Sequence, residues 1–130
     1  MFSTTTKQNL HTREIGNITE DIALQFLEKN GLLLITKNFN SKMGEIDLIM
    51  EEKNTLVFIE VRYRKNTNYG LPEETVGYKK QTKIQKTALL FISKNPRYKN
   101  IQPRFDVVAM TPDNKTSGNN MSINWIQNAF

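Results

Sequence analysis

The hydrophobic positions of this chain change their spacing along its length, and each spacing predicts a different element. Between residues 13 and 30 they recur every three or four residues, which predicts an amphipathic helix that stops at Gly31. The segments 32–38, 45–51 and 55–63 then alternate or run apolar between short polar turns. This pattern predicts an antiparallel meander of three strands.

The second half of the chain predicts another helix and two more strands. Apolar spacing predicts a long helix over 73–95, which ends before a proline, and strands over 104–110 and 122–126. Residues 1–12 are polar, and we expect them to be disordered. We therefore predict a single α/β domain over 13–130, with a central mixed sheet of about five strands flanked by helices.

Two of the predicted strands carry acids at positions that alternation brings together. Asp47 lies on the face opposite Ile46 and Leu48, and Glu60 shares a face with Arg62, because side chains two apart in a strand point the same way. If the strands pair, Asp47 and Glu60 lie side by side. Two adjacent carboxylates repel unless a cation lies between them, and Mg²⁺ is the natural occupant. A solvated cross-strand ion pair with the arginine is the alternative.

The surroundings of Glu60 bear on these alternatives. The run from Leu56 to Val61 is nearly all apolar, which predicts a central strand buried on both faces. An acid in such a strand is costly unless it is paired or ligates a metal. This favours a metal site formed by Asp47 and Glu60.

Two helical residues point toward the same region. Glu20 falls in the first helix's stripe of small residues, with Gly16 and Ala23, rather than among its charges. Lys80 lies near the apolar face that Ile84 defines in the second helix, and it needs an acidic partner there. The alternatives are a glutamate favoured by the helix dipole and a snorkelling lysine. The first helix is apolar on two sides, so we expect it to lie against the sheet and against either another helix or a second subunit, and the second case would be a homodimer.

Composition removes several classes of chemistry. The chain has no cysteine and one histidine, His11, so disulfides, thiolate zinc sites and histidine-based triads are not expected. No segment approaches the length of a membrane span, and the N-terminus lacks the apolar core of a signal peptide. We expect a cytoplasmic protein without a membrane partner.

Charge is distributed unevenly along the chain. The net charge is +5, but residues 62–104 hold 11 basic residues against Glu73 and Glu74, a local balance of +9 that leaves −4 elsewhere. Such a basic half is typical of a nucleic-acid-binding protein, although a solvated lysine-rich helix face gives the same pattern. The side chains that we expect to follow a phosphate backbone are Arg64, Lys65, Lys79, Lys83 and Lys86.

Four segments carry a resemblance to a known family. They are Gly44-Glu45-Ile46-Asp47-Leu48-Ile49, Val57-Phe58-Ile59-Glu60-Val61-Arg62, Arg104-Phe105-Asp106-Val107-Val108 and the terminal Ala129-Phe130. Together they resemble the YraN-like family of uncharacterised bacterial proteins. That family looks like a branch of the PD-(D/E)XK nucleases, which share the restriction-endonuclease-like α/β/α fold with archaeal Holliday junction resolvases.

The resemblance implies a set of roles. The nuclease pattern has an acid on the first helix, an acid on the second strand and an acid-x-lysine on the third, which fall on Glu20, Asp47, Glu60 and Arg62. It implies that the three acids hold Mg²⁺ or Mn²⁺. Arg62 departs from the expected lysine and cannot act as a base, because a guanidinium stays protonated in proteins. Lys80 matches a lysine of the family's second helix, and we expect these five residues to be catalytic.

Residues and resemblance together predict a nucleic-acid-binding protein of the nuclease fold. The active form would be a Mg²⁺-dependent endonuclease that hydrolyses phosphodiester bonds in DNA. The alternative is a non-catalytic nucleic-acid-binding module, or a protein-interaction subunit, that kept the fold.

Overall fold

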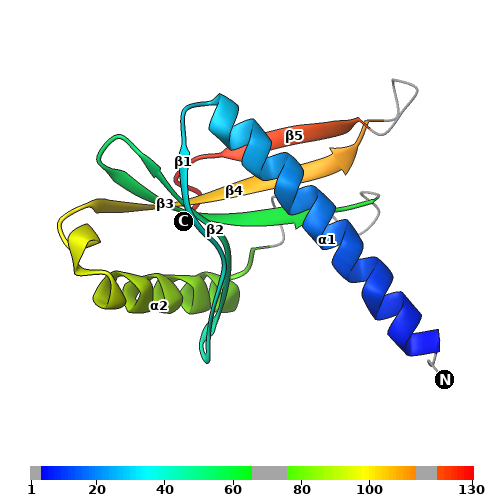
Figure 1. The fold of residues 1–130 in the computed structure, drawn as a ribbon, viewed down its shortest axis with the longest axis horizontal. Coiled ribbons are helices and arrows are strands. Elements are labelled where there is room, and N and C mark those ends of the chain that lie inside the picture. Colours follow the sequence, from blue (N-terminus) through cyan, green and yellow to red (C-terminus); the bar gives the residue numbers. More distant parts are fainter. Residues whose placement is uncertain (1–3, 66–75, 114–119) are drawn as a thin grey trace.

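Five strands form one mixed sheet in a computed structural model of the protein, with a helix on each face (Figure 1). Residues 4–65, 76–113 and 120–130 are described, with side chains of the first helix from Glu14 onward. The elements are α1 (Thr4–Lys29), β1 (Leu33–Ser41), β2 (Gly44–Glu52), β3 (Thr55–Tyr63), α2 (Tyr78–Lys94), the 3-10 helix η2 (Pro96–Tyr98), β4 (Gln102–Pro112) and β5 (Met121–Ile126). The predicted α/β class is confirmed.

The sheet has the order β1-β2-β3-β4-β5. Strands β1, β2 and β3 form the predicted antiparallel meander, while β4 runs parallel to β3 and β5 antiparallel to β4. The parallel pair requires a crossover connection, which α2 supplies. The third strand is central, as predicted, and is buried from Leu56 to Glu60.

The helix boundaries differ from the predicted ones in two places. Helix α1 begins at Thr4 rather than at residue 13, because no proline or glycine interrupts the chain before Gly16. The expected disorder of residues 1–12 stays a prediction. Helix α2 begins at Tyr78, and residues 73–75 of the predicted helix lie outside the described residues. None of the helices in the described ranges is both long and apolar enough to cross a membrane.

Each face of the sheet has its own hydrophobic core. Helix α1 packs Ala23 and Leu27 on a cluster that includes Leu48, Met50, Val57, Ile59, Val108 and Met110. Helix α2 packs Ile84, Ala88 and Phe91 on a cluster that includes Ile49, Leu56 and Phe58. This division follows from the two-residue period of the strands, and β3 serves both cores because it is apolar on both faces.

The β1–β2 hairpin bends toward α2, and this corrects one prediction. Ile46 packs in the α2 cluster, whereas Leu48 packs in the α1 cluster, so the two do not share a face as expected. The bend coincides with Asn38, opposite this stretch in β1, whose φ of 52° lies in the left-handed region that asparagine tolerates. The hairpin end thereby comes to lie along α2 (Figure 1).

A buried acid ties the last two strands together. Asp106 in β4 is fully buried and accepts two hydrogen bonds from Arg104, each of 2.9 Å. It also accepts 2.9 Å bonds from Trp125 Nε1 in β5 and from the Asn128 amide. The carboxylate is therefore saturated with donors, which is how a buried charge is tolerated.

Candidate active site

A pocket of about 310 Å³ lies where β2 and β3 separate. The ladder between the two strands stops at the pair Leu48 and Ile59, so the next residues, Asp47 and Glu60, are no longer joined by backbone pairing. Beyond that pair the Asp47 side chain replaces the backbone as the hydrogen-bond acceptor, because its Oδ2 accepts a 2.8 Å hydrogen bond from the Val61 amide. The opening brings side chains from both faces of the sheet into one space.

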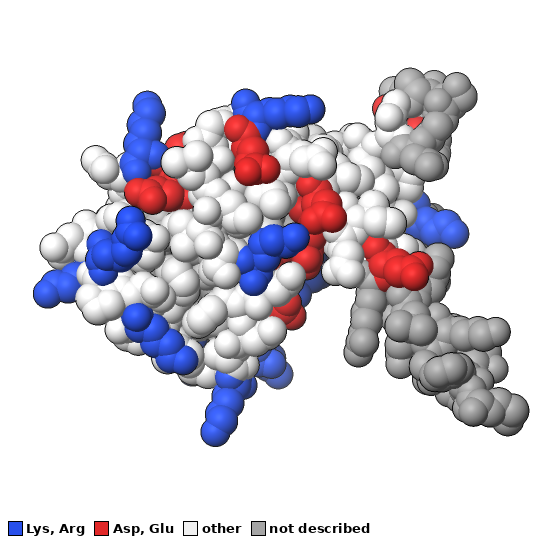
Figure 2. Space-filling view, viewed as in Figure 1, with Lys and Arg blue, Asp and Glu red and all other residues white. Residues whose placement is uncertain are grey.

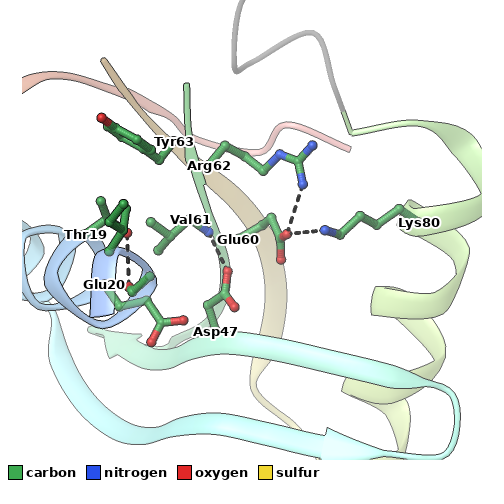
Figure 3. Close-up of a pocket in the computed structure, with 10 residues that line it drawn as sticks. Thr19, Glu20, Asp47, Glu60, Val61, Arg62, Tyr63 and Lys80 are labelled. Carbon is green, nitrogen blue, oxygen red and sulfur yellow. Dashed lines mark hydrogen bonds and ion pairs between the residues drawn. The ribbon is translucent and has the colours of Figure 1, made fainter. Parts of the chain in front are cut away.

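The pocket gathers all five residues that the sequence predicts to be catalytic. Its lining consists of Ile15, Gly16, Thr19, Glu20, Asp47, Glu60, Val61, Arg62, Tyr63 and Lys80. Figure 3 shows Glu20 reaching in from α1, Asp47 from β2, Glu60 and Arg62 from β3, and Lys80 from α2. Residues that lie 60 positions apart in the chain, Glu20 and Lys80, thus face the same space. Their roles stay predictions.

Asp47 is the acid whose environment is most unusual for a carboxylate. Burial raises the pKa of Asp47 to about 8, the negative charges of Glu60, Glu20 and Glu45 add to the rise, and the Val61 hydrogen bond opposes it. At neutral pH this carboxyl is therefore largely protonated in the absence of a cation. A divalent cation would favour its charged form.

Glu60 is held by two cationic side chains. Its side chain is only 6% exposed, and its Oε1 lies 2.6 Å from Lys80 Nζ and 3.6 Å from Arg62 Nη1. Lys80 thus has the acidic partner that its position near the apolar face of α2 predicted, although its own side chain is partly exposed. These two contacts offset the cost of burying the Glu60 charge.

Glu20 also belongs to a second group of polar residues, together with Asn38 and Glu45. The sequence predicted Glu20 but not this grouping. Burial raises the pKa of Glu20, and the charge of Glu45 raises it further, whereas a hydrogen bond from Asn38 lowers it. With its amide nitrogen turned toward the acids, Asn38 donates to Glu45 Oε1 at 3.0 Å and to both Glu20 oxygens at 3.2 Å. The same left-handed residue that bends the hairpin therefore links α1 to β2.

The carboxylate oxygens of the pocket are ligands that a hard divalent cation prefers. Among the described residues, no three His, Cys, Asp or Glu side chains converge as a complete set of metal ligands. Mg²⁺, however, is commonly held by one or two carboxylates, while waters and substrate phosphates complete its shell. Asp47 and Glu60 supply two such oxygen donors, and a cation would relieve the repulsion that raises the pKa of Asp47. The donor set therefore fits Mg²⁺ or Mn²⁺.

The other predicted basic residues lie outside this pocket. Arg64 and Lys65 follow the end of β3, where the Arg64 amide donates to Met110 O at 3.1 Å. Lys79, Lys83 and Lys86 are exposed along α2. In Figure 2 basic side chains stand around the part of the molecule that holds α2 and the end of the β1–β2 hairpin.

Known proteins resemble this chain over most of its length. The sequence pattern of the uncharacterised protein family UPF0102 matches residues 19–110, a range that contains all five predicted catalytic residues. A UPF0102 protein of Vibrio campbellii is 45% identical over 119 residues, which cover 91% of this chain and 93% of the relative. One from Caldanaerobacter subterraneus is 41% identical over 125 residues, which cover 95% and 99%. One from Francisella tularensis is 42% identical over 122 residues, which cover 93% and 97%.

Proposed function

The chain belongs to the uncharacterised protein family UPF0102, and we propose that it is a nucleic-acid-binding protein that cleaves phosphodiester bonds in DNA with the help of a divalent cation. The site of this chemistry is the pocket between β2 and β3. The proposal rests on the residues of that pocket, because the family's description carries no activity.

The observation that carries the proposal is a cluster of carboxylates bordered by positive side chains. Asp47 and Glu60 stand at the separation of two strands, and Lys80 and Arg62 stand beside Glu60. A phosphodiester group is an anion that needs cations around it, and its cleavage builds up further negative charge. Carboxylates that can hold a metal and cationic side chains that can hold a phosphate lie in one pocket, and this combination suits that reaction better than it suits a purely structural ion pair.

The acids divide the metal-binding role among them. Asp47 and Glu60 would hold the cation, and Glu20 would add a further contact, direct or through water. When bound, Mg²⁺ or Mn²⁺ would supply positive charge against the phosphate and acidify an attacking water. The 2.8 Å bond from the Val61 amide fixes the orientation of the Asp47 carboxylate before any ligand arrives.

The two cationic side chains supply fixed charge. The Arg62 guanidinium can donate two parallel hydrogen bonds to a phosphate, and it cannot accept a proton at any ordinary pH. The Lys80 ammonium, 2.6 Å from Glu60, is close enough to swing from that carboxylate to a bound phosphate. Both would stabilise the charge that develops on the phosphate oxygens.

A second candidate function is binding without cleavage, and one observation favours it. The Glu60 oxygen that a metal would need is already paired with Lys80 at 2.6 Å and with Arg62 at 3.6 Å. A site balanced in this way by the protein's own cations requires no metal. Such a protein would hold a nucleic-acid backbone through its lysines and leave it intact.

A cleavage assay separates the two functions. Labelled linear and branched DNA is incubated with Mg²⁺, Mn²⁺ or EDTA, with wild-type protein and with Glu60→Gln. The endonuclease proposal predicts products only with a divalent cation, and only from wild type. Binding to DNA with no products under any cation would support the second candidate instead. Equal cleavage by Glu60→Gln would place the activity outside this pocket.

A further inference from the structure

The end of the β1–β2 hairpin is fixed against the exposed side of α2. A Cβ added at Gly44 would lie 3.5 Å from both Lys83 Cβ and Thr87 Oγ1, so the turn touches the helix directly. Ser41 Oγ lies 3.3 Å from Thr87 Oγ1 and accepts a 3.0 Å hydrogen bond from the Met43 amide. The turn therefore has one defined position relative to the helix.

This docking places two exposed lysines on neighbouring elements. Lys42 is at the tip of the turn, two residues before Gly44, and Lys83 is on the helix turn that Gly44 touches. Neither lysine forms an ion pair with any residue that the structure describes. Two like charges on rigid, touching elements repel each other, and an anion between or over them would remove that repulsion.

The lysines of α2 connect this position to the pocket. Lys80 lines the pocket, and Lys83 follows it by three residues, or about 4.5 Å along the helix axis. Lys79 and Lys86 extend the exposed basic stripe over about 10 Å. One strand of a DNA duplex carries a phosphate every 3.4 Å along its axis, so this length corresponds to about three phosphates.

We propose that the β1–β2 turn, through Lys42, forms with α2 a second contact surface for the nucleic-acid backbone, continuous with the pocket. The inference rests on the proposed function, since the same strand would pass from the pocket across Lys80 and Lys83 to the turn. It adds to the expected basic residues a lysine that lies outside the basic half of the sequence. The bent hairpin brings it there.

The test compares two exposed lysines that lie in the turns at opposite ends of β2. Lys42 lies in the turn before β2, and Lys53 lies in the turn after it; both are exposed. Binding of labelled DNA is measured by fluorescence anisotropy in EDTA over a range of salt concentrations. Wild type, Lys42→Ala, Lys53→Ala and Lys42→Ala/Lys83→Ala are compared, and matching melting temperatures confirm that all are folded.

The expected result is a loss confined to the Lys42 side. Each phosphate contact contributes a slope of about 0.9 in log K against log salt, so Lys42→Ala should bind about eightfold more weakly at about 0.1 M salt. The double variant should lose about twice that slope, and Lys53→Ala should match wild type. If wild type binds DNA and Lys42→Ala behaves like Lys53→Ala, the inference is wrong and the proposed function stands. If wild type binds no DNA, both fail.

Discussion

The Asp47 carboxyl combines burial with three neighbouring acids, and this combination makes its protonation depend on folding. In the folded protein its pKa is raised to about 8, whereas the ordinary value is 3.8. Between these values the folded state binds a proton that the unfolded chain releases. The stability that this proton contributes is complete below about pH 4 and is lost as the pH rises toward 8.

Asp47→Asn removes this titration and keeps the shape of the side chain. In EDTA, we expect the melting temperature of Asp47→Asn relative to wild type to rise steadily between about pH 5 and about pH 8. Thermal unfolding at several pH values measures the difference. A difference that stays constant across this range would show that Asp47 titrates like an exposed acid.

Lys80 and a divalent cation compete for the same oxygen of Glu60. The Lys80 side chain is partly exposed, so its pairing with Glu60 is worth at most about 1 kcal/mol. We therefore expect Lys80→Met to bind Mn²⁺ up to about fivefold more tightly than wild type, because one competing cation is gone. Calorimetric titration measures this. Weaker binding by Lys80→Met would mean that the lysine supports the metal site instead of occupying it.

At the level of residues, the sequence predicted that Asp47 and Glu60 lie side by side, but it did not predict the contact between Asn38 and Glu20. Asp47 and Glu60 were predictable as neighbours because a tight turn fixes the register of β2 and β3 up to the pair Leu48 and Ile59, and the two acids are the next residues along. Asn38 was not predictable in the same way. Its contact with Glu20 depends on how α1 crosses the sheet, and only asparagine's tolerance of positive φ signalled a special position.

Among the elements, β4 and β5 depend on one buried carboxylate. Asp106 accepts bonds from Arg104, from Trp125 Nε1 and from the Asn128 amide. Asp106→Asn would remove the buried one of the two carboxylates that pair with Arg104 and leave only Glu52 at 3.2 Å, and we expect it to destabilise the fold by about 3 kcal/mol. Trp125→Phe removes one donor and should cost about 1 kcal/mol from that hydrogen bond. Urea unfolding measures both, and similar losses for the two variants would contradict this order.

The elements themselves were largely predictable, but the path of the hairpin was not. Alternation and turn residues gave the five strands, and their order along the chain gave the α/β class. The strand period alone placed Ile46 and Leu48 on one face, whereas the structure assigns them to opposite cores. A bend of this kind comes from a single left-handed residue and from packing on α2, and neither leaves a periodic signal in the sequence.

Across the whole molecule, membership of UPF0102, the YraN family, confirms the family that segments 44–49 and 57–62 suggested, whereas the relation to nucleases stays a prediction. The carboxylates and cationic side chains of the pocket come from four different elements. The second apolar side of α1, which favoured a homodimer, is partly used within the fold. Ile22 and Phe26 pack against the hydrophobic cluster between α1 and the sheet. The ring centroids of Phe26 and Trp125 lie 6.1 Å apart in an edge-to-face arrangement. Ile18, on the same side of α1, remains 54% exposed, and the homodimer stays a prediction.

The basic stripe on α2 should govern affinity for nucleic acid as a whole. Changing Lys79, Lys83 and Lys86 together to alanine removes up to three phosphate contacts. We expect weaker binding to all DNA sequences alike, with the slope of log K against log salt reduced by about 2.7. Anisotropy titrations at several salt concentrations measure the slope, and unchanged affinity would place the binding surface elsewhere.

The most direct test of the proposed site is calorimetric titration of Mn²⁺ into wild type and Asp47→Asn at about pH 8, where the Asp47 carboxyl is half ionised before the cation arrives. If the pocket between β2 and β3 is a divalent-cation site, wild type should bind one Mn²⁺ with release of protons, and Asp47→Asn should show at least about tenfold weaker binding. Equal and negligible heats in the two proteins would contradict the account, because Glu60 would then be balanced by Lys80 and Arg62 without a metal.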